Sequence, residues 1–251
     1  MATTSFESFK SDTKVRRPIP FIKWINFVIL PFALSLSLAL AVSSYVYTHS
    51  TSASTYNQNL TISPLRQLMG LSDISARAAP EFSLVDQKGQ RVSLAQFRGK
   101  AVLLSFLDSR CTTVCPVLAQ EFLLANHDLG STASKVAFIA VNVNPVANSV
   151  ADVSVFDNLH GLNKMANWYF LTGPAAKLAS VWKAYGIYVN VPQNSNQVTH
   201  ADYLFFITPS GQERYLASPV VDQTKNGTGY LPQPTLVQWG HGIATYLRRI
   251  L

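Results

Sequence analysis

The chain has 251 residues, of which 48% are hydrophobic and 13% charged, and its formal net charge is +7. This much apolar surface excludes a largely disordered protein. The charge does not indicate a nucleic-acid-binding protein, because five of the twenty Lys and Arg residues precede Trp24 and the others form no run beyond Arg248–Arg249.

Residues 25–47 form a continuous apolar segment, and no residue from Trp24 to Leu65 is charged. The length suits a helix that crosses a hydrocarbon core of about 30 Å. Basic residues precede the segment, so the positive-inside rule predicts a cytoplasmic tail, residues 1–24, and a single-pass membrane protein with the remainder outside. That compartment is the periplasmic side, or the mitochondrial intermembrane space in a eukaryote.

Two other interpretations of the apolar segment are open. It is a cleaved signal peptide if processing follows the small residues of Ala39-Leu40-Ala41. It is a buried helix if it belongs to a soluble core, although no polar face interrupts it. We favour the uncleaved anchor, because the leader is long and the apolar run continues past Ala41.

Residues 48–79, rich in Ser and Thr at their start, are predicted to be a flexible linker. Residues 80–251 alternate apolar runs with helical patterns. Strands are expected at 82–85, 91–93, 101–107, 136–143, 168–171, 203–208 and 213–216, and helices at 116–129, 174–185 and 235–249. The first two strands form an N-terminal β-hairpin. This order predicts an α/β sandwich with a mixed central sheet. It is compatible with a thioredoxin-like fold without singling that fold out.

The two cysteines, Cys111 and Cys115, lie where a buried strand gives way to a helix. A helix N-terminus favours a thiolate, and Arg110 is expected to add to the effect. Residues four apart on a first helical turn face the same way, so both sulfurs can meet one ion or form a disulfide. A bridge between them would close too small a loop to be mainly structural.

Two thiolates are soft donors that suit copper. Zinc sites usually need a fourth ligand and paired Cys motifs that this chain lacks. His200, just before an apolar strand, is the best candidate for a third donor, although a lone histidine there is more often an ordinary polar residue. His127, His160 and His241 have no comparable context.

These residues resemble the Sco/SenC copper-chaperone family from about residue 79 to the C-terminus. The similarity rests on APEFSLVDQKGQRVSLAQFRGKAVLLSF (residues 79–106), on Cys111-x-x-x-Cys115-Pro116, and on Val198-Thr199-His200 leading into YLFFITPSG. The resemblance implies a thioredoxin-like domain in which Cys111, Cys115 and His200 bind Cu(I) or Cu(II). It implies delivery of copper to the copper-bearing subunit of cytochrome c oxidase while the dinuclear copper centre is built.

Three positions depart from the family pattern. Thr199 replaces an Asp before the histidine, Ala201 replaces a Ser or Thr after it, and Asn142 replaces an acidic residue after the second buried strand. Loss of an outer carboxylate is expected to leave the imidazole less firmly oriented.

Two enzymatic alternatives use the same cysteines as catalytic residues. A thiol-disulfide oxidoreductase would use Cys111 and Cys115 to reduce the oxidase's copper-site cysteines or other extracytoplasmic proteins, and the sequence leaves open which cysteine attacks. A thiol peroxidase is disfavoured, because residues 106–110 lack the Pro and Thr expected ahead of its cysteine.

Overall fold

The computed structural model describes residues 62–191 and 198–251. In this part of the chain no helix is both long and apolar enough to span a membrane. The predicted anchor at residues 25–47 and the cytoplasmic tail lie outside the described residues, so both stay predictions.

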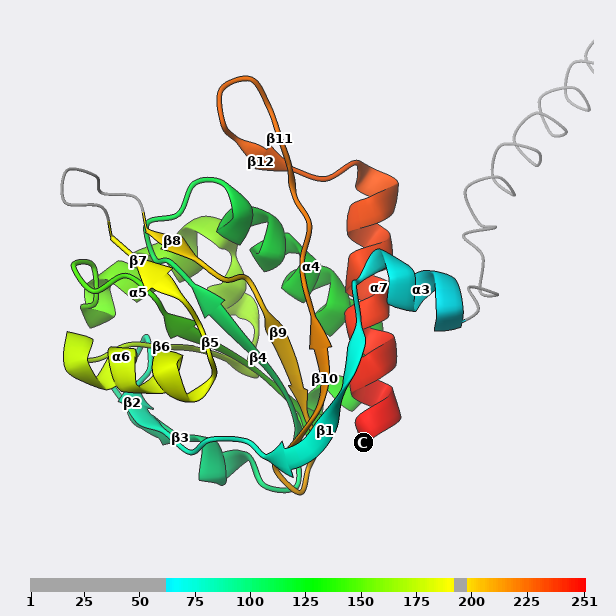
Figure 1. Ribbon diagram of the computed structural model, residues 1–251, viewed down its shortest axis with the longest axis horizontal. Coiled ribbons are helices and arrows are strands. Elements are labelled where there is room, and N and C mark those ends of the chain that lie inside the picture. Colours follow the sequence, from blue (N-terminus) through cyan, green and yellow to red (C-terminus); the bar gives the residue numbers. More distant parts are fainter. Residues whose placement is uncertain (1–61, 192–197) are drawn as a thin grey trace, which may run out of the picture. The chain divides into compact units, whose positions relative to one another are not determined.

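The central sheet contains six strands among the described residues, in the order β1-β10-β9-β4-β5-β6 (Figure 1). Their bounds are Ser72–Ala78 (β1), Ala101–Leu107 (β4), Val136–Asn142 (β5), Trp168–Leu171 (β6), Leu204–Ile207 (β9) and Gln212–Ala217 (β10). The pairs β4–β5 and β5–β6 are parallel and the other pairs are antiparallel. The predicted mixed sheet is confirmed.

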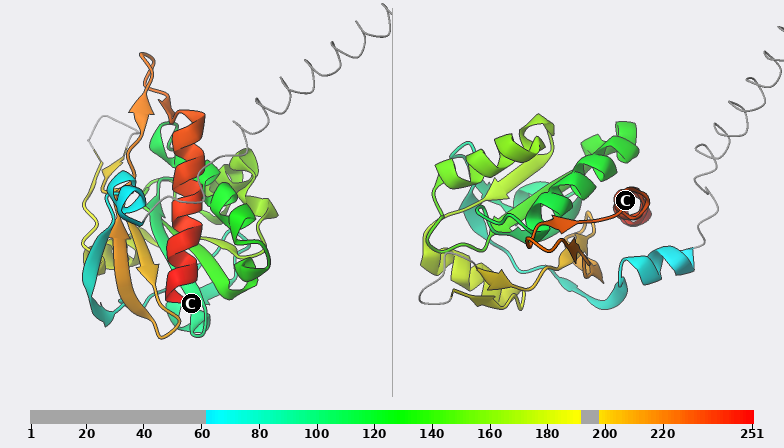
Figure 2. Two further views of the ribbon diagram at one scale, coloured as in Figure 1. Left: turned by 90° about the vertical axis from the view of Figure 1, so that its right-hand side faces the viewer. Right: turned by 90° about the horizontal axis from the view of Figure 1, so that it is seen from above.

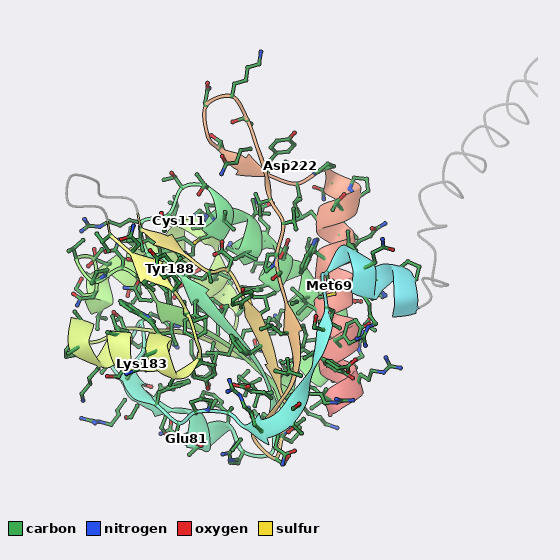
Figure 3. All side chains as sticks on the ribbon, viewed as in Figure 1. Met69, Glu81, Cys111, Lys183, Tyr188 and Asp222 are labelled. Atoms are coloured by element: carbon green, nitrogen blue, oxygen red, sulfur yellow. The ribbon has the colours of Figure 1, made fainter. Side chains whose placement is uncertain are left out.

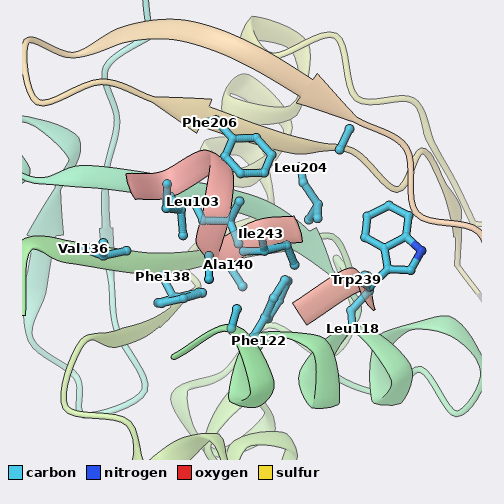
Figure 4. Packing of buried hydrophobic residues seen from close by; sticks show 14 of the residues in the cluster. Leu103, Leu118, Phe122, Val136, Phe138, Ala140, Leu204, Phe206, Trp239 and Ile243 are labelled. Carbon is cyan, nitrogen blue, oxygen red and sulfur yellow. The ribbon is translucent and has the colours of Figure 1, made fainter. Parts of the chain in front are cut away.

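Helices cover both faces of the sheet because its inner strands are apolar throughout. Every residue of β4 and β5 is buried, as expected for strands covered on both sides. One face packs against α4 (Val114–Leu129), α5 (Val150–His160) and α7 (Gln233–Ile250), and Figure 4 shows part of this core. The other packs against α6 (Ala175–Ala184) and the predicted N-terminal hairpin of β2 (Ser83–Val85) and β3 (Arg91–Ser93).

Helix α4 is fixed by its close packing against α7, which lies beside it in both views of Figure 2. The two backbones approach at Gly240, where a Cβ atom would lie 2.5 Å from the Cβ of Leu124. Only glycine fits at this distance, because real Cβ contacts essentially never fall below 3.0 Å. The helix that follows the cysteine loop is therefore held along its length.

The structure differs from the linker prediction, because residues 62–79 are folded. They form α3 (Ile62–Leu68) and the edge strand β1, and the side chains of Leu65 and Met69 are buried in the core. The sequence of β1, SDISARA, is mostly exposed and lacks an apolar pattern. It is a strand because it pairs with β10, which local sequence does not reveal.

Several short elements were also not predicted. Helix α5 has a capping box between Ser149 and Asp152, a signal that could have located it. The remaining elements are the strands β7 (Val189–Asn190), β8 (Thr199–His200), β11 (Asp222–Gln223) and β12 (Gly229–Tyr230), and the 3₁₀ helices Leu94–Phe97, Gly130–Lys135 and Leu162–Lys164.

A buried acid links α5 to the sheet. Asp157 is 1% exposed, and its Oδ1 accepts a hydrogen bond of 2.8 Å from the indole N–H of Trp168. Burial raises the pKa of Asp157 to about 7, while the bond from Trp168 acts in the opposite direction. A carboxyl whose pKa is raised by folding binds its proton more tightly in the native state than in the unfolded state. The stability that protonated Asp157 contributes to the folded state is therefore fully present below the unfolded pKa of about 4. It is lost as the pH rises to about 7.

We therefore expect Asp157→Asn to flatten the pH dependence of stability. The variant cannot ionise and should exceed the wild type at pH 8 by up to about 4 kcal/mol, the upper bound set by a shift of about three pKa units. The measurement is urea unfolding of the full-length chain between pH 4 and 8. Asp152→Asn is the contrasting control, because the pKa of Asp152 is lowered by its hydrogen bond to Ser149 and its contribution is lost on acidification instead. Parallel curves for the wild type and Asp157→Asn would contradict the assignment.

Candidate metal site

The two cysteines lie at the junction between strand β4 and helix α4. Strand β4 ends at Leu107 and α4 begins at Val114, so Cys111 is in the connecting loop and Cys115 is in the first turn of the helix. Cys115 is fully buried, Cys111 is partly exposed, and both are free thiols. The loop follows the C-terminal end of β4, an inner strand of the sheet. The cysteine pair therefore lies at one end of the sheet, near its middle strands.

Hydrogen bonds converge on the sulfur of Cys111. The backbone N–H of Cys115 donates to it over 3.4 Å, and the Thr113 hydroxyl lies 3.5 Å away. The backbone N–H of Cys111 in turn donates to the carbonyl of Asp108. This arrangement is that of a helix N-terminus whose free N–H groups face an anion.

The two thiols therefore have opposite acidities. Hydrogen bonds, first from the Cys115 side chain and then from Thr113 and the backbone, lower the pKa of Cys111 to about 5 against the opposing effect of burial. Burial, reinforced by the neighbouring Cys111, raises the pKa of Cys115. At neutral pH the pair holds one thiolate, on Cys111, and one thiol, on Cys115.

Arg110 does not have the role expected from the sequence. Its guanidinium forms an ion pair of 3.2 Å with Asp152 of α5. The causes that lower the pKa of Cys111 are hydrogen bonds at the helix terminus. Arg110 connects the cysteine loop to α5.

A cluster of buried polar side chains holds the cysteine loop through hydrogen bonds. Asp108 Oδ1 accepts the backbone N–H of Arg110 and the side-chain amide of Asn144, each over 2.8 Å. Asn142 Oδ1 accepts the N–H of Ser109 over 3.4 Å, and its NH₂ group donates to the carbonyl of Ala147 over 2.7 Å. A carboxylate at position 142 would have no proton for the second bond. The departure from the family pattern at Asn142 thus has a structural reason.

His200 lies in strand β8, where it pairs with Val189 of β7. Its side chain is 6% exposed, and Nδ1 lies 3.3 Å from Asp202 Oδ1 and 3.3 Å from the carbonyl of Ala201. Within residues 62–191 and 198–251, no three His, Cys, Asp or Glu side chains are grouped closely enough to hold a metal ion. The structure brings Cys111 and Cys115 together, whereas His200 as the third ligand stays a prediction.

Asp202 is a site residue that the sequence analysis missed. Its carboxylate acts electrostatically on both cysteines and on His200. The available signal was its spacing, because residues two apart in an extended segment share a face. Of the histidines left as ordinary residues, His241 pairs with Asp128 at 3.0 Å, and the ring of His160 packs 4.4 Å from that of Phe156.

A polar cleft of about 370 Å³ opens above Cys111. Its walls are the cysteine loop on one side and the β11–β12 hairpin on the other, and Figure 3 shows Cys111 and Asp222 at the same end of the molecule. The hairpin rests on the loop at Gly229, where a Cβ atom would lie 2.2 Å from the carbonyl oxygen of Thr113. Partner groups can therefore reach Cys111 from solvent, whereas Cys115 is fully buried and does not line the cleft.

We expect Cys111 to be alkylated first, with a reaction rate that follows a thiolate of pKa about 5. Brief treatment of the full-length chain with iodoacetamide, followed by peptide mass spectrometry, should label Cys111 at every pH above about 5 and spare Cys115. Cys115→Ala removes the main donor and should move the Cys111 profile to higher pH. Preferential labelling of Cys115, or a Cys111 profile centred above pH 8, would contradict this arrangement.

Comparison with known proteins identifies the family and agrees with the fold. The family model SCO1/SenC matches residues 72–225. The SCO1 protein homolog of Bacillus subtilis is 26% identical over 133 residues, which cover 52% of this chain and 68% of that protein. The mitochondrial SCO2 homolog of Bos taurus is 27% identical over 138 residues, and this alignment spans 50% of its length.

A solved structure gives the same result for the fold. The structure of Bradyrhizobium japonicum ScoI with copper bound superimposes with a TM-score of 0.53 at 22% identity, covering 70% of this chain and all of that one. The matching family model extends over more than half of the 251 residues. The chain therefore belongs to the SCO1/SenC family.

Proposed function

We propose that this chain is a copper metallochaperone that carries one copper ion on Cys111, Cys115 and His200. The observation that carries the proposal is the thiol pair at the N-terminus of α4, where hydrogen bonds converge on the Cys111 sulfur and lower its pKa to about 5. Copper, particularly Cu(I), prefers soft sulfur donors, and an imidazole completes a three-coordinate site. Binding would require β8 to bring His200 closer to the two sulfurs, because these three side chains are not grouped closely enough to hold a metal ion.

The acidities of the two thiols set the order of events during loading. Cys111 is deprotonated and exposed to the cleft, so it meets the ion first. Cys115 is protonated and buried, so it must lose its proton to become a ligand. Release follows the reverse order, because ligands of an acceptor reach the ion from the cleft, on the Cys111 side.

The acceptor we propose is the copper-bearing subunit of cytochrome c oxidase, as the family resemblance implies. Residues 25–47 would anchor the chain in the membrane with its folded domain on the periplasmic side, or in the intermembrane space of a mitochondrion. Anchoring would keep donor and acceptor on one membrane face. The copper in the Bradyrhizobium japonicum relative supports the choice of metal.

Copper titration of the detergent-solubilised full-length chain tests this proposal. We expect one Cu(I) per chain and, at pH 7, about one proton released per ion as Cys115 ionises. Cys111→Ala and Cys115→Ala should each weaken binding by more than about 100-fold, since losing a ligand costs more than the 10–100-fold typical of an outer partner. His200→Ala should weaken it to a smaller extent, because both thiolates remain.

The matched control is His241→Ala, which removes a histidine that is also paired with an aspartate but belongs to α7. It should bind copper as the wild type does. Undiminished copper binding by a variant lacking Cys111, Cys115 and His200 together would rule the proposal out.

A second candidate function, thiol-disulfide exchange, is favoured by the unequal exposure of the two cysteines. The Cys111 thiolate would attack one sulfur of a substrate disulfide, and the other substrate sulfur would leave as a thiolate. The Cys115 thiol would then lose its proton and attack Cys111, which releases the reduced substrate and leaves a Cys111–Cys115 disulfide. The greater exposure and lower pKa of Cys111 favour attack by Cys111 and resolution by Cys115, a choice the sequence left open.

If exchange is the main activity, metal-free protein should reduce a disulfide peptide, and Cys115→Ser should accumulate a mixed disulfide on Cys111. His200→Ala separates the two functions, because it should weaken copper binding and leave disulfide reduction unchanged. Gel-shift and mass spectrometry of the trapped species give the readout. Trapping on Cys115 in a Cys111→Ser variant, and not on Cys111, would contradict the assigned roles.

A further inference from the structure

Asp202 and His200 form a pair of polar groups, and the Asp202 carboxylate lies within electrostatic range of the two cysteines. Asp202 Oδ1 lies 3.3 Å from His200 Nδ1. The imidazole is almost fully buried, and the Asp202 side chain is 25% exposed. The charges of the carboxylate and of the cysteine pair act on one another.

Asp202 has an unmet hydrogen-bonding requirement. Its Oδ1 atom is shielded from solvent and has no hydrogen-bond partner. A buried carboxylate oxygen without a donor is costly. His200 Nδ1 lies 3.3 Å from this oxygen, and an N–H group on Nδ1 directed at Oδ1 would satisfy it.

The surroundings of Nδ1 also select the imidazole tautomer. Nδ1 faces two acceptors, Asp202 Oδ1 and the carbonyl oxygen of Ala201, each at 3.3 Å. Two acceptors facing Nδ1 favour the tautomer in which Nδ1 carries the proton. Nδ1 is then the hydrogen-bond donor, and Nε2 keeps its lone pair. A metal ion can then bind only through Nε2.

We propose that Asp202 is a positioning residue for copper, holding His200 in the Nδ1–H tautomer with Nε2 free to bind the ion. The inference rests on the proposed function. Thr199, the residue before the histidine, has no carboxylate and is exposed, so it cannot act in this way. Histidine ligands in metal sites usually donate their second N–H to such an acceptor, which orients the ring and raises its basicity.

The first experiment uses metal-free, full-length protein and reads the tautomer directly. Two-bond ¹H–¹⁵N spectra at about pH 8, where an unperturbed histidine is neutral, should show His200 in the wild type as the Nδ1–H form. Asp202→Asn, which has the same shape and no charge, should move the equilibrium toward the Nε2–H form. Asp128→Asn is the matched control, because it removes the acid from the His241 pair without affecting His200.

The second experiment measures copper affinity in a double-mutant cycle. Asp202→Asn should weaken Cu(I) binding about 10- to 100-fold, and Asp128→Asn should not change it. In the His200→Ala background, Asp202→Asn should cost nothing further, because its effect passes through the imidazole. A purely structural role would instead weaken binding equally in both backgrounds.

Specific outcomes would overturn the inference. They are an Nε2–H tautomer in the wild type, an unchanged tautomer in Asp202→Asn, additive losses in the cycle, or spectroscopic evidence that an Asp202 oxygen is itself a copper ligand. If wild-type protein binds no copper, the proposed function fails. The tautomer experiment then still decides whether Asp202 orients His200.

Discussion

The hydrogen bond from the Cys115 N–H to the Cys111 sulfur is the interaction on which the site depends. It forms because two rigid elements fix the short loop between them. Strand β4 is buried and paired on both sides, and α4 is packed against α7 across Gly240. The fold thereby places both the side chain and the backbone N–H of Cys115 against the Cys111 sulfur. These hydrogen bonds, the side-chain one foremost, lower the pKa of Cys111 without a charged side chain.

The same geometry accounts for two chemistries in one family fold. A thiolate beside a protonated, buried thiol is a ready ligand for a soft ion and also a nucleophile with its resolving partner. The group that would separate these chemistries is His200, which we propose as a copper ligand and which has no role in the proposed exchange between the two sulfurs. The environment of that imidazole therefore matters as much as the cysteines.

Sequence reasoning predicted the elements that carry strong local signals. The apolar runs of β4 and β5, the hairpin turn at residues 86–89 and the amphipathic pattern of α7 each specify their structure locally. Strand β1 could not be predicted in this way, because it exists only through pairing with the distant strand β10. Strands β7 and β8 have two residues each, which is too short for a local pattern. For the site, the cysteine spacing predicted the thiol pair, whereas the Asp202–His200 contact depends on the three-dimensional arrangement of the chain after β8. Thr199 predicted a loosely held imidazole, and Asp202 is the acid that we propose to orient it instead.

The contact between Gly229 and Thr113 joins segments more than one hundred residues apart. It is made by backbone atoms, because glycine has no side chain. Side-chain rotamer changes cannot adjust a contact between backbone atoms. The width of the cleft over Cys111 is consequently set by the main chain of the β11–β12 hairpin. Any residue larger than glycine at position 229 would push the hairpin away from Thr113 and widen the cleft. The Cys111 sulfur would then be more exposed to oxidants and to other metals, although Cys111, Cys115 and His200 would be unaltered.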